Sequence, residues 1–193
     1  DASTVTDHVF VPTTVTEEQG ERLPVGKEKI MMVDAALFAI RELMEEYPEA
    51  LVYGQDVGRR LGGVFREAAT LAEQFGDHRV FNTAIQEAYI IGSTVGMSAV
   101  GLKPFVEVQF ADYIFPACDQ IVNETAKFRY RSGNEFNVGG IVFRSPYGGG
   151  IAGGHYHSQS PEAYFAHTPG LKVVIPRDPY QAKGLLLASI ASP

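Results

Sequence analysis

Short apolar runs alternate with segments of helical spacing from Lys29 to the end of the chain, and this alternation constrains the fold more than any other feature. The runs that we expect to be strands are ALVYG (50–54), RVFNT (79–83), KPFVEVQF (103–110), GGIVFRSPY (139–147) and KVVIP (172–176). The segments that we expect to be helices cover 35–47, 67–75, 86–100, 116–130, 160–167 and 179–190. Strands that alternate with helices in units of this size favour a parallel sheet. Because the runs are almost continuously apolar, helices should cover both faces, and we predict an α/β fold with a doubly wound, mostly parallel sheet.

The region before this alternation has a different character. Residues 1–28 are rich in Thr, Val, Glu and Pro and show no sustained periodicity. We interpret them as a linker or N-terminal arm, and a disordered tail is the open alternative. Residues 29–193 then form one α/β domain, which is large enough to bury a core without disulfide or metal support.

Composition excludes several classes of protein. The formal net charge is −7 and the basic residues are scattered, so the chain lacks the basic stripe that nucleic acid requires. No apolar run approaches the roughly 20 residues that a membrane-spanning helix needs. The single cysteine, Cys118, cannot form an internal disulfide. This favours a reducing compartment, which would be the cytoplasm, or the mitochondrial matrix in a eukaryote.

Glu87 stands where such folds place chemistry, just after a strand of the parallel sheet. It begins a helix that is otherwise small or apolar, AYIIGS. A carboxylate in these surroundings loses solvation. Thr83 or Asn82 could cap the helix, which would put Glu87 in the first turn, where the helix dipole favours negative charge. Position alone leaves two interpretations open: a chemically active carboxylate, or a glutamate that supports the cap and faces water.

The loop after the fourth expected strand, GGGIAGGHYHSQSPE (148–162), is rich in glycine and carries two histidines. Its glycines satisfy G-x-G-x-x-G, but the long helix and the acidic residue about 20 positions later that a dinucleotide site requires are missing. His155 and His157 could begin a zinc site, but no third ligand follows at a recognisable spacing. A histidine on a pliable loop at a strand end suits general acid–base chemistry. A hydrogen-bonded loop histidine without such a role is the alternative.

Tyr113 follows the third expected strand and allows two interpretations. An aromatic ring at a strand end can stack on a flat heterocycle. It can equally belong to the core, because Ile114, Cys118 and Ile121 continue at helical spacing.

Four long segments together resemble one family. FNTAIQEAYIIG (81–92), EVQFADYIFPACDQIVNETAKFRYRSG (107–133), YHSQSPEAYFAHTPGLKVVIP (156–176) and PYQAKGLLLASI (179–190) resemble the β chain of the first component of the thiamine-diphosphate-dependent 2-oxo acid dehydrogenases. They resemble the branched-chain enzyme most, and the pyruvate enzyme second. The resemblance runs from about Ile30 to the end of the chain. It implies a transketolase-like pyrimidine-binding domain within a decarboxylating oxidoreductase.

The resemblance also implies roles for individual residues. Glu87 matches the glutamate that hydrogen-bonds the aminopyrimidine ring of thiamine diphosphate and activates it. His157 matches the histidine that assists reductive acylation of the lipoyl group. Tyr113 and Ile85 match residues that line the pyrimidine pocket. A structural potassium ion is implied at Gly139, Ile141, Val142, Ser189 and Ser192. Val142 and Ser192 depart from the threonine and aspartate of the branched-chain enzyme.

By the same resemblance, this chain supplies half of a cofactor site. The Gly-Asp-Gly motif that precedes the magnesium-binding Asn in the family belongs to the α portion, so the α portion should hold magnesium and the diphosphate. The implied partners are this α portion, a second β portion in a heterotetramer, and the lipoyl-bearing acyltransferase. Because the chain begins at Asp1 and the family's C-terminal β domain would follow Pro193, we expect it to be part of a longer polypeptide. The alternatives are the β portion of pyruvate dehydrogenase and a non-catalytic docking module of a multienzyme complex.

Overall fold

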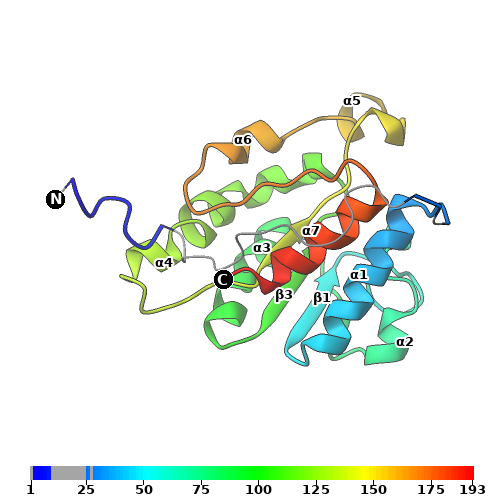
Figure 1. Cartoon of the computed structure of the whole chain (residues 1–193), viewed down its shortest axis with the longest axis horizontal. Coiled ribbons are helices and arrows are strands. Elements are labelled where there is room, and N and C mark those ends of the chain that lie inside the picture. The colour runs from blue at the N-terminus through cyan, green and yellow to red at the C-terminus, as the bar shows by residue number, and fades with distance from the viewer. Residues whose placement is uncertain (1, 10–24, 27) are drawn as a thin grey trace.

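Four parallel strands form the centre of the protein in a computed structural model that describes residues 2–9, 25–26 and 28–193 (Figure 1). The strands are β1 (Ala50–Gly54), β2 (Val80–Asn82), β3 (Lys103–Glu107) and β4 (Val142–Arg144). Their order in the sheet is β2-β1-β3-β4. In the register, Val52 lies opposite both Val80 and Phe105. Chain order therefore reverses between β1 and β3, and sheets of this type bind ligands beyond the carboxyl ends of the strands at such a switch point.

Helices cover both faces of the sheet, as the continuous apolar runs predicted. The helices are α1 (Met32–Glu46), α2 (Leu71–Phe75), α3 (Glu87–Ala99), α4 (Phe128–Arg131), α5 (Gly154–His157), α6 (Glu162–Ala166) and α7 (Pro179–Ala191). Shorter helical turns are η1 (Ala111–Ala117), η2 (Gln120–Thr125) and η3 (Gly149–Ile151). Val52 and Phe105 point to a core that is completed by α1, α2 and α7, and α1 lies beside α7 in Figure 1. Tyr53 and Val106 point to the opposite core, which α3, η1, η2 and α6 complete.

The first helix illustrates how local sequence produces this packing. The buried side chains of α1 recur at helical spacing and form one stripe: Ala35, Ala36, Ala39, Ile40, Leu43 and Met44. Asp34 accepts a hydrogen bond from the backbone N–H of Met31, which satisfies a donor at the start of the helix. Pro48 follows the last turn and cannot continue the helical hydrogen bonds, so α1 ends at Glu46.

The prediction of a fifth strand at 172–176 is wrong for this structure. These residues form neither helix nor strand and pair with none of the four strands, and Val173, Val174 and Ile175 are 40%, 50% and 53% exposed. A cavity of about 720 Å³ is lined by this segment on one side and by β4 on the other. The apolar, β-branched sequence has strand propensity, but propensity yields a strand only where a neighbouring strand supplies backbone partners.

Two predicted helices also differ from the observed elements. The expected helix 67–75 begins only at Leu71, because Thr70 has a left-handed backbone (φ 67°) and Glu67 is drawn into a buried ion cluster. The expected helix 116–130 is divided among η1, η2 and α4. Pro116 lies inside η1, and the Thr125 hydroxyl donates to the Gln120 carbonyl oxygen, five residues earlier, within the wide turn η2. Within the described ranges, no helix has the length and apolar character that a membrane crossing requires.

Replacing Gly54 with alanine is expected to destabilise the sheet. An added Cβ would collide with the backbone carbonyl oxygen of Glu107 on the neighbouring β3, and the backbone there cannot move without breaking the ladder. We expect a loss of about 1–3 kcal/mol in the free energy of unfolding, measured by urea titration. The control is Gly149→Ala, where an added Cβ meets no atom within 4 Å. Equal unfolding midpoints for the two variants would contradict this packing.

Candidate functional site

The candidate site is built from segments that follow the carboxyl ends of β1, β2 and β3. Gln55 comes directly after β1, and Glu87 is the first residue of α3, after β2. Phe110, Asp112 and Tyr113 lie in the segment after β3. These residues lie at the edge of the sheet where the sequence predicted the functional residues.

Glu87 is half-buried and held by a neighbour that the sequence did not identify. Its Oε1 accepts a hydrogen bond of 2.9 Å from Nε2 of Gln55, and Gln55 is only 8% exposed. A buried amide that donates to a carboxylate fixes the orientation of that carboxylate. Glu87 therefore stands in the first turn of α3 with one oxygen fixed and the other available to a second donor.

The predicted cap of this helix is not observed. Gln86 occupies the position before α3, and no side chain caps the helix there. The Asn82 side-chain oxygen instead accepts a 2.6 Å hydrogen bond from the backbone N–H of Gly58 and so fixes the loop after β1. The Thr83 hydroxyl is buried and has no hydrogen-bond partner among the described residues. Neither candidate therefore caps α3.

His157, at the end of α5, is held among residues that follow β3. Its Nδ1 lies 3.1 Å from Oδ1 of Asp112. The imidazole stacks on the ring of Phe110, with centroids 3.9 Å apart and planes 21° apart. The ring of Tyr113 meets it edge-on at 5.5 Å. The structure therefore brings together two of the predicted site residues, His157 and Tyr113, and adds Asp112 and Phe110, which sequence reasoning missed.

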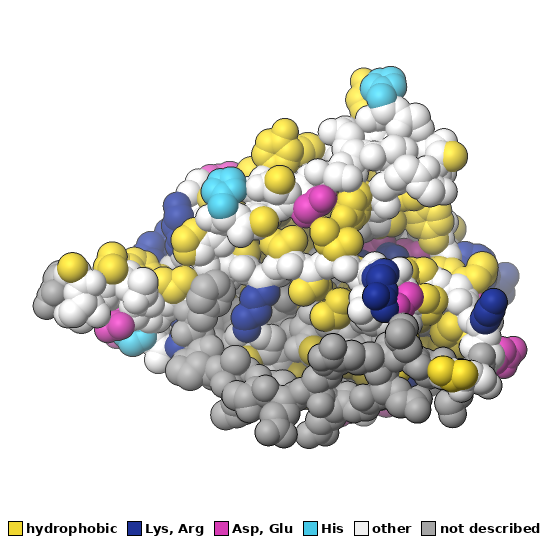
Figure 2. Space-filling model, turned by 45° about the horizontal axis from the view of Figure 1, so that its top comes forward, with side chains coloured by type: hydrophobic (Ala, Val, Ile, Leu, Met, Phe, Trp, Pro, Cys, Tyr) yellow, Lys and Arg dark blue, Asp and Glu magenta, His cyan; other side chains and the backbone are white. Residues whose placement is uncertain are grey.

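The other predicted site residues occupy different surroundings. Ile85 is 82% exposed, in the loop just before α3, and Tyr113 is 41% exposed. His155 is exposed on α5 and packs against Tyr156. The region of α5 projects from the body of the molecule and carries histidine at its tip in Figure 2. Among the described residues, no group of three or more His, Cys, Asp or Glu side chains is placed to hold a metal ion.

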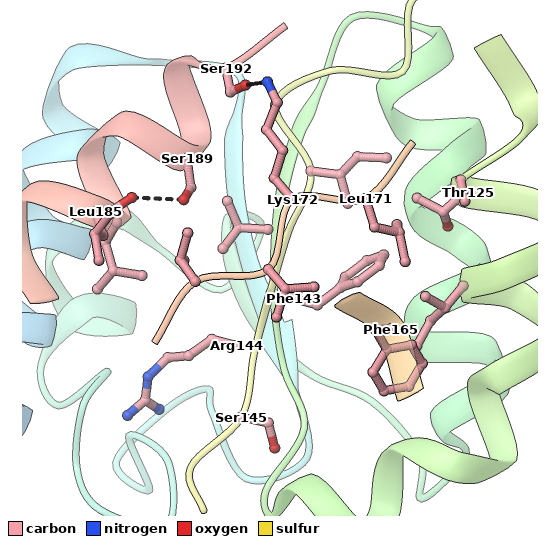
Figure 3. A pocket seen from close by; sticks show the side chains of 18 of the residues that line it. Thr125, Phe143, Arg144, Ser145, Phe165, Leu171, Lys172, Leu185, Ser189 and Ser192 are labelled. Carbon is pink, nitrogen blue, oxygen red and sulfur yellow. Dashed lines mark hydrogen bonds between the residues drawn. The ribbon is translucent and has the colours of Figure 1, made fainter. Parts of the chain in front are cut away.

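The five predicted potassium ligands all line the cavity between β4, α7 and residues 170–176. Two of them already have hydrogen-bond partners, since Ser98 donates to the Gly139 carbonyl at 2.8 Å and the Ser189 hydroxyl donates to the Leu185 carbonyl at 2.7 Å. The Lys172 ammonium donates to Oγ of Ser192 at 2.6 Å, as Figure 3 shows. An ammonium at this position repels a second cation, so the arrangement fits potassium poorly. The potassium site stays a prediction from the resemblance.

A buried ion cluster at the ends of β3 and β4 was also missed by sequence reasoning. Nη1 of Arg144 lies 2.5 Å from Oε1 of Glu107 and 3.4 Å from Oε1 of Glu67. Glu67 and Glu107 are 1% and 2% exposed. Burial raises the pKa of Glu107 to about 8, although the guanidinium of Arg144 acts in the opposite direction. Two buried carboxyl groups share one guanidinium, so a single retained proton makes the cluster neutral.

Comparison with known proteins places the site in context. Residues 28–193 match the transketolase pyrimidine-binding domain. The β subunit 2 of mitochondrial 2-oxoisovalerate dehydrogenase from Arabidopsis thaliana is 60% identical over 155 residues, which cover 80% of this chain and 43% of that protein. The corresponding β subunit from Bacillus subtilis is 51% identical, over 82% of this chain and 48% of that protein. These relatives confirm the resemblance that the four sequence segments predicted.

The chain is also similar to a second type of 2-oxo acid dehydrogenase subunit and to one solved structure. The β subunit of the first component of pyruvate dehydrogenase from Acholeplasma laidlawii is 46% identical, over 85% of this chain and 50% of that protein. A solved structure described as a split-gene transketolase, an inactive β4 tetramer, matches with a TM-score of 0.63. It is 23% identical and the match covers 85% of this chain and 49% of that one, so it shows the fold alone. The chain spans about half or less of the length of the curated relatives it matches.

Proposed function

We propose that this chain, which belongs to the transketolase pyrimidine-binding domain family, is the β portion of a thiamine-diphosphate-dependent branched-chain 2-oxo acid dehydrogenase. The observation that carries the proposal is the Glu87 carboxylate, fixed by Gln55 at the carboxyl edge of the sheet. The complete enzyme would decarboxylate a branched-chain 2-oxo acid and transfer the acyl group to lipoyl groups of an acyltransferase. The names of the relatives support the branched-chain substrate.

The residues of this edge suit the aminopyrimidine half of the cofactor. Glu87 keeps one carboxylate oxygen free of the bond to Gln55, and this oxygen can hold a proton shared with a ring nitrogen. The exposed side chains of Ile85 and Tyr113 offer apolar surface to a flat ring. Thiamine diphosphate, when bound, supplies the electron sink for decarboxylation.

In this proposal, the second half of the cofactor site comes from a partner. Magnesium and diphosphate need carboxylates and main-chain donors, and the described residues offer no carboxylate cluster for a metal. We assign this part to an α portion, and we assign a second β portion and the lipoyl-bearing acyltransferase as the other partners. His157 would serve the acyltransferase by handling a proton during lipoyl acylation. The mitochondrial and bacterial relatives support a place in the matrix or the bacterial cytoplasm.

A substrate panel tests the proposal. The chain combined with its α partner should decarboxylate 3-methyl-2-oxobutanoate with a kcat/KM about tenfold or more above that for pyruvate, because extra methyl groups bind an apolar pocket. The α partner alone is the control. A higher kcat/KM with pyruvate would favour the pyruvate dehydrogenase β portion, which the Acholeplasma relative represents. A stable complex without activity toward any 2-oxo acid would favour the docking module.

A further inference from the structure

We propose that Asp112 is a positioning residue that fixes the tautomer and orientation of His157. The inference rests on the proposed function, in which His157 handles a proton while the lipoyl group is acylated. The proposed function alone gives the Asp112 carboxylate no task.

The contact between Asp112 and His157 determines which ring nitrogen is available. Oδ1 of Asp112 lies 3.1 Å from Nδ1, and the Asp112 side chain is only 6% exposed while that of His157 is 26% exposed. An ionised carboxylate can only accept a hydrogen bond, so Nδ1 must carry the proton. In the neutral ring this leaves Nε2 without a proton. The side chain of a free histidine in water prefers the tautomer with the proton on Nε2. The hydrogen bond to Asp112 therefore selects the tautomer with the proton on Nδ1.

The orientation of the ring is fixed by the same segment of chain. Phe110 stacks on one face of the imidazole at 3.9 Å, and Tyr113 meets it edge-on. The helix that carries His157 has four residues and follows a glycine-rich loop, so it holds the ring weakly by itself. Phe110, Asp112 and Tyr113 belong to the segment after β3, which the sheet anchors. The orientation of the His157 ring is therefore set by the segment after β3 and not by α5, which carries the residue.

This arrangement matches the proton balance of lipoyl acylation. The disulfide bond of the lipoyl ring breaks, one sulfur bonds to the substrate carbon, and the other sulfur takes up a proton; the carbon would then give up its bond to the cofactor and become the acyl carbon. The electron pair that decarboxylation leaves on the substrate carbon forms the new carbon–sulfur bond and reduces the disulfide. The proton comes from Nε2 of the imidazolium form of His157. After the transfer, the ring retains its proton on Nδ1, and Asp112 accepts the hydrogen bond that this N–H donates.

Two partial reactions of the assembled enzyme test the consequence for catalysis. Asp112→Asn should lower kcat for acylation of a free lipoyl domain by about tenfold or more, since partners that orient a functional imidazole have effects of this size. Decarboxylation with ferricyanide as oxidant bypasses the lipoyl group, and its rate should change by less than about twofold. The matched control is Asp119→Asn, an exposed carboxylate that bonds the Asn123 side chain. Equal losses in both partial reactions would assign Asp112 a merely structural role and overturn the inference.

The imidazole tautomer provides a readout that does not depend on activity. In enzyme labelled with ¹⁵N-histidine, at a pH where the ring is neutral, the His157 signal should show a protonated Nδ1. Asp112→Asn should move this signal toward protonated Nε2, and an unchanged signal would overturn the inference. The spectrum of His157→Gln identifies the signal among the five histidines.

The same variants separate the inference from the proposed function. If His157→Gln acylates lipoyl domains normally, the role of His157 in the proposed function fails. If His157→Gln is impaired but Asp112→Asn is not, the inference alone fails.

Discussion

Glu87→Gln is expected to lower the decarboxylation rate of the enzyme, assembled from this chain and its α partner, by about 100-fold or more. The substitution preserves the size of the side chain but removes the negative charge that the free oxygen offers to a ring nitrogen. Initial rates with ferricyanide as oxidant, at saturating thiamine diphosphate, measure the effect directly. Affinity for the cofactor should change little, because the α portion would hold the diphosphate.

Two further variants make this prediction specific. Gln55→Leu removes the amide that orients Glu87 and should cost about tenfold in rate, in line with the loss of a supporting hydrogen bond. Glu73→Gln on α2 is the control, because Glu73 is an exposed helix residue. Activity that survives Glu87→Gln would refute the assignment of this carboxylate.

Much of the fold could be predicted because its elements have strong local periodicity. The stripe from Ala35 to Met44 identified α1, and the run Ala50–Gly54 matches β1 residue for residue. The fifth strand could not be judged in the same way. Residues 172–176 have the composition of a strand, but a strand forms only where a neighbouring strand lies close enough to pair. The sequence does not show that this segment lies across a cavity from β4.

The candidate site was predicted in part for a related reason. Glu87 and His157 were found because they follow apolar runs, and such positions lie at the carboxyl edge of a parallel sheet. Their partners escaped notice, since Gln55 is 32 residues from Glu87 and Asp112 is 45 residues from His157. The N-terminal arm predicted for 1–28 lies mostly outside the described residues, so its boundary stays a prediction.

The buried cluster of Glu67, Glu107 and Arg144 makes the stability of this protein depend on pH. The folded state raises the pKa of Glu107 from an ordinary value of 4.5 to about 8. Between these values the folded protein binds more protons than the unfolded chain, so its stability falls as the pH rises. The stabilising contribution is complete below about pH 4.5 and is lost as the pH passes through 8. The unfolding midpoint should therefore be lower at pH 9 than at pH 6, and Glu107→Gln should flatten this difference.

Arg144→Met should be the most destabilising of the changes considered. It removes the guanidinium from two carboxyl groups that are 1% and 2% exposed, and the free energy of unfolding at pH 9 should fall by about 3–5 kcal/mol, the cost of an unpaired buried charge. The loss should be smaller at pH 6, where the carboxyl group of Glu107 is protonated. Urea unfolding at the two pH values measures it. Arg131→Met is the control, because Arg131 pairs with Glu124 at the surface and should change stability little. A loss for Arg144→Met that is equal at pH 6 and pH 9 would show that packing of the side chain, rather than charge, stabilises the ends of β3 and β4.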